Sequence, residues 1–104
     1  MTAERTAANR TELTGRLLER GNLRYTPAGV PVIEFRIAHV SEQIEAGQTR
    51  RVECEIACVA LGMIARIFGD TTPGIDLTAN GFLASRSLKQ KTLVMHVTEI
   101  KFAE

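Results

Sequence analysis

Apolar and polar residues alternate in five stretches of the chain, as they do in β-strands that bury one face. In the second stretch, Ile33, Phe35 and Ile37 alternate with charged or small residues, which places these three side chains in a core. Turn-forming residues separate the stretches, notably in the loop at residues 21–31 and the turn at residues 45–48. The pattern predicts strands at residues 11–17, 32–39, 51–60, 75–84 and 93–102.

The apolar period changes between the third and fourth predicted strands. Leu61, Ile64 and Phe68 fall on one face of a helix, and Gly69 stands where a glycine often ends one. Three strands, a short helix and two strands follow the order of the OB-fold, a five-stranded Greek-key barrel. The main alternative is an open five-stranded sheet with one helix packed on it.

Two glycines favour the barrel over the open sheet. Gly15 and Gly81 stand inside predicted strands, where glycine weakens a strand unless the sheet must bend sharply. A small sheet that closes into a barrel needs such bends. The expected fold class is therefore all-β, a five-stranded OB-fold Greek-key barrel with one short helix between strands 3 and 4.

Length and composition agree with one folded domain. The chain has 104 residues, of which 44% are hydrophobic and 24% charged, as in an ordinary globular protein. We expect a flexible N-terminal tail at residues 1–8 and a single OB-fold domain at residues 9–104. No apolar run approaches the roughly 20 residues of a membrane span, and Met1 to Arg10 lacks the apolar core of a signal peptide. These features predict a cytoplasmic protein with no membrane association.

Residues that could support catalysis or metal binding are isolated in the sequence. Cys54 and Cys58 stand in one predicted strand about 13 Å apart, too far for a disulfide or a shared metal, and both are expected to be small buried side chains. His39 and His96 are interpreted as structural, and no phosphate-binding loop or activated nucleophile is present. We therefore expect no enzyme activity, no metal and no cofactor.

Positive charge gathers late in the chain although the net charge is only +1. From Leu77 to Thr98 there are three cations and no acid, and the cations lie between the last two strands. OB-folds grip oligonucleotides through this loop and the loop between the first two strands. A charged, solvated turn is the alternative interpretation. The candidate nucleic-acid-binding residues are Arg86, Lys89, Lys91, Arg24, Tyr25, Arg50, Arg51 and Arg36.

Several segments resemble known families. Residues 9–10, 13–17, 23–32 and 35–38 resemble the opening half of bacterial single-stranded DNA-binding proteins. The segments at residues 45–47, 50–54, 80–82 and 94–96 are more similar to the primosomal replication protein N (PriB) family, a relative of those proteins. Members of that family lack the Gly- and Gln-rich linker and acidic tip of the longer proteins, and this sequence ends at Glu104, directly after its last predicted strand.

The resemblance implies a homodimer that works in DNA replication restart. It implies binding to single-stranded DNA and to the restart helicase PriA and, in some species, to the protein DnaT. One alternative is an adaptor that stimulates the helicase while its own DNA binding is vestigial, and another is a general single-stranded DNA-binding protein. A cold-shock type RNA-binding barrel is a further alternative, but its aromatic clusters on strands two and three are absent.

Aromatic residues for base stacking are scarce. Gln48 and Glu53 stand where some members of the family carry stacking aromatics. Phe35 and Phe68 fall on predicted core faces, and Phe82 and Phe102 are expected in the core, with an edge position as the alternative. Tyr25 is then left as the exposed aromatic. We therefore expect weak binding that rests on phosphate contacts, with log K falling against log salt at a slope of about −2 to −3 per protomer.

Overall fold

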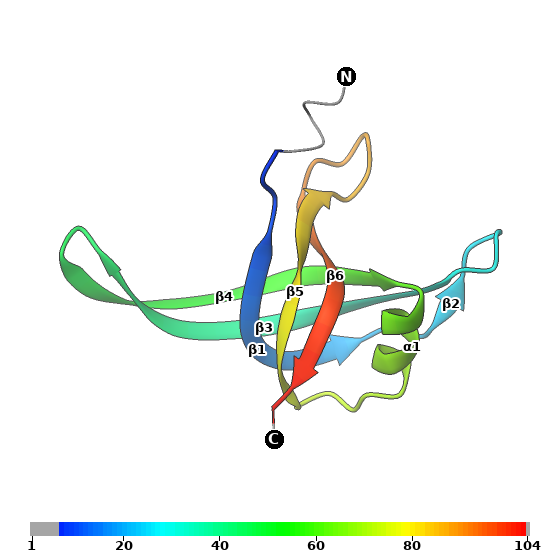
Figure 1. Ribbon diagram of the computed structural model, residues 1–104, viewed down its shortest axis with the longest axis horizontal. Coiled ribbons are helices and arrows are strands. Elements are labelled where there is room, and N and C mark those ends of the chain that lie inside the picture. The colour runs from blue at the N-terminus through cyan, green and yellow to red at the C-terminus, as the bar shows by residue number, and fades with distance from the viewer. Residues whose placement is uncertain (1–6, 104) are drawn as a thin grey trace.

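The computed structural model describes residues 7–103, so most of the predicted flexible tail lies outside the described residues. The five predicted strands are confirmed, and a two-residue strand is added in the loop after the first (Figure 1). The helix follows the third long strand, as predicted. The elements are β1 (Thr11–Arg20), β2 (Arg24–Tyr25), β3 (Pro31–Glu45), β4 (Gln48–Leu61), α1 (Met63–Gly69), β5 (Asp76–Ser85) and β6 (Leu93–Phe102). Within residues 7–103, no helix is long and apolar enough to cross a membrane.

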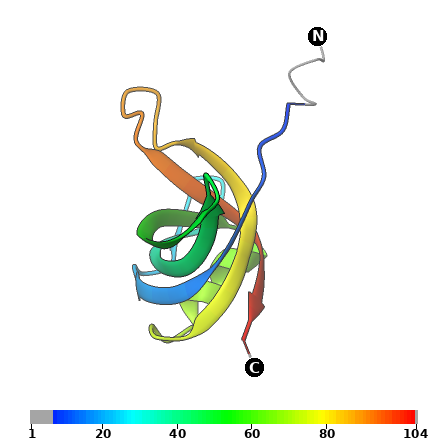
Figure 2. The ribbon, with the colours of Figure 1, turned by 90° about the vertical axis from the view of Figure 1, so that its left-hand side faces the viewer.

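The five long strands close into a barrel. Neighbouring strands follow the order β1-β5-β6-β4-β3, and β1 also pairs with β3, which completes the ring. β5 and β6 run across the β3–β4 hairpin in Figure 1, and Figure 2 looks along that hairpin. The pairing of β4 with β6 is parallel, whereas the other pairings are antiparallel. The structure therefore confirms the OB-fold barrel and excludes the open sheet.

Alternating apolar residues of the strands fill the barrel, and α1 closes one end of it. The ring of Phe68, from α1, stacks on Phe35 of β3 with ring centroids 4.0 Å apart. Burial of these rings is the main reason that a helix of only seven residues is held in place. The other large, fully buried side chains are Leu17, Ile33, Ile37, Leu77, Met95 and Cys58.

Both strand glycines lie where the backbone of another strand approaches closely. A Cβ atom on Gly81 would overlap the carbonyl oxygen of His96, and the register of β5 against β6 shifts between Asn80 and Gly81. A Cβ atom on Gly15 would likewise overlap the carbonyl oxygen of Ala38 on β3, at the point where β1 leaves β5 for β3. The prediction that these glycines permit the closure of the barrel is confirmed.

The helix differs from its prediction at both ends. Gly69 is the last residue of α1 and lies against Leu23, so the C-cap position that the sequence assigned to Gly69 belongs to Asp70. The glycine with positive φ stands at the other end, since Gly62 reverses the chain between β4 and α1 with φ 79°. Leu61 is exposed instead of buried, because it still belongs to β4.

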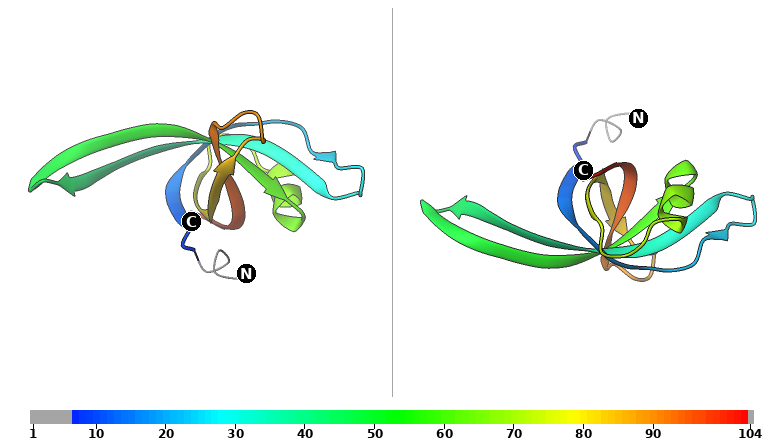
Figure 3. Two further views of the ribbon diagram at one scale, coloured as in Figure 1. Left: turned by 90° about the horizontal axis from the view of Figure 1, so that it is seen from above. Right: turned by 90° about the horizontal axis from the view of Figure 1, so that it is seen from below.

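The β3–β4 hairpin extends well beyond the barrel (Figure 3). The sequence predicted that the strands end at His39 and resume at Arg51, but pairing continues to a two-residue turn at Ala46-Gly47, where both residues have positive φ. Because this projecting part packs on nothing within residues 7–103, both of its faces are solvated. The prediction that both cysteines are buried is therefore wrong for Cys54, which is exposed on β4, while Cys58 is buried.

Candidate nucleic-acid interface

The loop between β5 and β6 carries the densest group of predicted contacts. Its ends are joined by a hydrogen bond from the backbone N–H of Arg86 to the carbonyl of Thr92, 2.9 Å long. Ser87 tightens the tip, since its hydroxyl accepts a hydrogen bond from the backbone N–H of Gln90. Lys89 and Lys91 are exposed, and neither forms a salt bridge within residues 7–103. Both ammonium groups are thus available to a phosphate.

The loop between β1 and β3 holds the second group. Thr26 and Val30 close its turn by backbone hydrogen bonding, and Gly29 supplies the positive φ that the turn requires. Tyr25, directly before this turn, is 54% exposed. The guanidinium of Arg66, from α1, lies 6.0 Å from the centroid of its ring, so one face of the tyrosine carries a cation.

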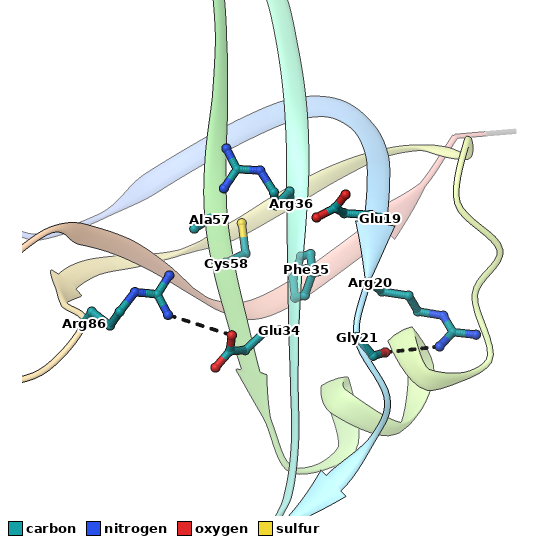
Figure 4. Close-up of a pocket in the computed structure, with 9 residues that line it drawn as sticks. All are labelled: Glu19, Arg20, Gly21, Glu34, Phe35, Arg36, Ala57, Cys58 and Arg86. Carbon is teal, nitrogen blue, oxygen red and sulfur yellow. Dashed lines mark hydrogen bonds and ion pairs between the residues drawn. The ribbon is translucent and has the colours of Figure 1, made fainter.

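Glu34 of β3 joins the two loops. One of its carboxylate oxygens, Oε2, accepts a hydrogen bond from Nη2 of Arg24 at 2.8 Å. The other, Oε1, lies 3.8 Å from Nη1 of Arg86, as Figure 4 shows. The structure therefore brings Arg24 and Arg86 to one place, although they stand far apart in the sequence. Sequence reasoning missed Glu34, and the signal that could have found it is an outward-facing acid on the strand between the two basic loops.

A pocket of about 320 Å³ lies beside Glu34 on the outer face of β3 and β4 (Figure 4). Three arginines line it, against two glutamates. Arg20 is anchored by hydrogen bonds to the carbonyls of Thr71 and Gly21, and Arg36 pairs with Glu55 at 3.4 Å. The lining residues are Glu19, Arg20, Gly21, Glu34, Phe35, Arg36, Ala57, Cys58 and Arg86.

The remaining two predicted arginines lie apart from this pocket, on the projecting β3–β4 hairpin. Arg50 pairs with Glu45 at 2.7 Å, and Arg51 pairs with Glu53 at 2.5 Å. Glu53 is the acid that stands where some members of the family carry an aromatic, and its charge is balanced here by a neighbour. The hairpin arginines are thus partly neutralised before any ligand arrives.

One exposed aromatic was not expected. Phe82 of β5 is 38% exposed, so the prediction that it lies in the core is wrong, whereas Phe102 is partly buried against the core, as predicted. The ring of Phe82 stacks on the imidazole of His96 with ring centroids 4.9 Å apart and planes 6° apart. Strand alternation could have shown this, because Leu77, Ala79 and Leu83 contact the core and Phe82 stands on the opposite face of β5.

Histidines and acids form no metal site in the part of the chain that the structure describes. His39 is held by Oγ of Ser41 and the carbonyl of Thr14, at 2.8 and 2.7 Å, which agrees with a structural role. Residues 7–103 contain no group of three or more His, Cys, Asp or Glu side chains that could hold a metal ion.

Comparison with known proteins places this geometry in a family. Residues 9–99 match the family model described as another single-strand binding protein family. The chain belongs to this family of single-strand binding proteins. Its relatives include the replication restart protein PriB of Bordetella pertussis, 41% identical over 93 residues that make up 89% of this chain and 87% of the relative. The PriB protein of Nitrosomonas europaea is 32% identical over 89% of this chain and 86% of the relative. The resemblance to the PriB family is thus confirmed.

Solved structures of single-strand binding proteins and PriB share the fold. The structure of PriB from Ralstonia solanacearum aligns with a TM-score of 0.85 and 36% identity over 94% of this chain and all of that one. The single-stranded DNA binding protein from Thermus aquaticus aligns with a TM-score of 0.74 and 26% identity, over 93% of this chain and 50% of that protein. This chain therefore corresponds in length to PriB and to about half of the longer protein.

Proposed function

We propose that the chain is a single-stranded DNA-binding accessory factor of the replication-restart primosome, one that contacts the restart helicase PriA. The relatives are named for replication restart, and the family is one of single-strand binding proteins. The observation that carries the proposal is the meeting of two basic loops, with Arg24 and Arg86 on one carboxylate. OB-folds hold oligonucleotides between these two loops.

Phosphate contacts supply most of the binding free energy in this proposal. Lys89 and Lys91 meet the backbone first because they are exposed and unpaired within residues 7–103, and Arg24 and Arg86 follow. Tyr25 offers one stacking face, worth about 1 to 3 kcal/mol for one base. With so few aromatic rings, affinity depends on counterion release and falls as salt is added.

A salt titration with a fluorescent single-stranded oligonucleotide tests this function, with duplex DNA as the control. We expect preference for the single strand and a slope of log K against log salt of about −2 to −3 per protomer. The triple variant Arg86→Ala, Lys89→Ala, Lys91→Ala should lose single-strand binding. Tight binding that survives high salt would contradict the proposal, because it would require a stacking surface of greater extent.

A helicase adaptor with vestigial DNA binding is the second candidate. It is favoured by the hairpin, where Arg50 and Arg51 are both neutralised by glutamates. Stimulation of PriA by the same triple variant separates the two candidates. Stimulation that survives the loss of DNA binding supports the adaptor, whereas stimulation that disappears with it supports the DNA-binding factor.

The quaternary structure is proposed to be a homodimer, and DnaT is proposed as a further partner. Among residues 7–103, the projecting part of the β3–β4 hairpin leaves its outer strand edges unpaired, and a second copy of the chain can cover them. Sedimentation at micromolar concentration should give a species of twice the 11.4 kDa mass of one chain. A monomer under these conditions would overturn the dimer. Binding of labelled DnaT to the complex with DNA tests the second partner.

A further inference from the structure

Glu34 is placed to contact two arginines that approach from different loops. Its side chain points outward from β3, and each carboxylate oxygen faces a different guanidinium, Arg24 at 2.8 Å and Arg86 at 3.8 Å. All three side chains are solvated, with 52% of Glu34, 62% of Arg24 and 37% of Arg86 exposed. Exposed ion pairs of this kind contribute little to folding, so they can open at small cost.

The chemistry of this contact is that of a phosphodiester between two arginines. A carboxylate and a phosphodiester each present two oxygens that share one negative charge, and guanidinium groups bind both kinds of anion through charge-assisted hydrogen bonds. We propose that the space between Arg24 and Arg86 is a binding site for one backbone phosphate of single-stranded DNA, and that Glu34 occupies it in the free protein. The inference rests on the proposed function.

The surroundings favour an anion once Glu34 has moved away, because Arg20, Arg36 and Arg86 then stand against one acid of the pocket lining, Glu19. Arg36 lies in the same pocket, and its own pairing with Glu55 at 3.4 Å is longer than that between Arg24 and Glu34. Arg20 is fixed at the edge of the pocket by its hydrogen bond to the carbonyl of Thr71. A phosphate must therefore replace Glu34 as the partner of the two arginines, and the released carboxylate then repels the DNA. Glu34 acts as an internal competitor that weakens binding.

The variant Glu34→Gln tests this competition, with Asp76→Asn as the matched control. Asp76 is 53% exposed, pairs with Arg16 at 3.0 Å, and lies at the opposite end of β5 from the basic loop. Both substitutions remove one half-exposed carboxylate and raise the net charge by the same amount. We expect Glu34→Gln to bind a single-stranded oligonucleotide about three- to tenfold more tightly than the unaltered protein, and Asp76→Asn to bind nearly as the unaltered protein does.

A double-mutant cycle connects the effect to the two arginines. In the background Arg24→Gln, Arg86→Gln, the substitution Glu34→Gln should improve affinity no more than Asp76→Asn does. Equal gains from Glu34→Gln and Asp76→Asn in the unaltered background would overturn the inference, since they would reveal only a general charge effect. Weaker binding by Glu34→Gln would also overturn it, since Glu34 would then hold the arginines in place for the DNA. If the unaltered protein does not bind single strands at all, the proposed function itself fails.

Discussion

Gly15 of β1 lies in direct contact with the backbone of Ala38 of β3, so that a Cβ atom on Gly15 would overlap the Ala38 carbonyl oxygen and crowd the side chain of Ile37. At this crossing β1 changes partners, since it pairs with β5 up to Arg16 and with β3 from Arg16 onward. The closure of the barrel thus depends on the absence of a side chain at one position.

Replacing Gly15 with alanine should destabilise the protein by about 1 to 3 kcal/mol, because the strands must move apart to admit the methyl group. Urea denaturation followed by circular dichroism measures the change. Gly21→Ala is the matched control, since its Cβ would lie 3.6 Å from the carbonyl oxygen of Glu34, an ordinary contact. Equal stabilities of the two variants would show that the crossing tolerates a side chain.

Acid should remove the stabilisation that Asp76 gives. The hydrogen bond from Arg16, and then its charge, lower the pKa of the Asp76 carboxyl below its ordinary value of 3.8. A carboxyl whose pKa is lower in the folded state stabilises the fold above the unfolded pKa and loses this effect as the pH falls through the folded pKa. The difference in urea midpoint between the unaltered protein and Asp76→Asn should therefore persist at neutral pH and shrink below pH 3.8. A constant difference throughout the acid range would contradict this.

The two cysteines should differ sharply in reactivity. Burial raises the pKa of the Cys58 thiol to about 12, whereas Cys54 is exposed on the projecting hairpin. Since the thiolate is the reactive form, iodoacetamide at mildly alkaline pH should add once to the folded protein and twice to the unfolded protein, as counted by intact mass. The variant Cys54→Ser should remain unmodified while folded. Two additions at equal rates to the folded protein would show that Cys58 is accessible.

The ring of Tyr25 should contribute to DNA binding by stacking. Tyr25→Leu should weaken single-strand binding by about 1 to 3 kcal/mol, whereas Tyr25→Phe should bind as the unaltered protein does because it keeps the ring. Fluorescence anisotropy at one low salt concentration measures both variants. A leucine variant that binds normally would show that the ring faces no base.

Strand alternation and the strand glycines predicted the barrel because both depend on the surroundings of single residues. Alternation reflects the burial of one strand face, and a strand glycine reflects the close approach of another backbone. Ile33, Phe35 and Ile37 face the core as their spacing indicates, and Gly15 and Gly81 mark positions where another backbone approaches too closely to admit a side chain. The length of the β3–β4 hairpin could not be predicted, since its projecting part buries nothing against the barrel and so shows no burial pattern to find. The exposure of Cys54 follows from the same feature.

The candidate site was predictable only residue by residue. Charge and loop position indicated Arg24 and Arg86, but their meeting at Glu34 is a property of the closed barrel, which brings the two loops together. The pairing of Arg51 with Glu53 is the exception, because residues two apart on one strand share a face and the sequence alone could have indicated it. Individual side chains that can bind a phosphate can be recognised in a sequence, whereas their partners on other strands and loops depend on the three-dimensional fold.

The parallel pairing of β4 with β6 is the shortest seam of the barrel among residues 7–103, with two paired positions, Cys58 with Met95 and Val59 with His96. Backbone pairing thus joins the β5–β6 hairpin to the rest of the barrel mainly through β1, which pairs with β5 from Thr11 to Arg16. We expect transient opening at this seam, on the timescale that amide hydrogen exchange detects, to swing the hairpin and its lysines as one unit. The contact between Arg86 and Glu34 spans this seam, and in the DNA complex proposed above a phosphate held between Arg24 and Arg86 would span it in place of the carboxylate.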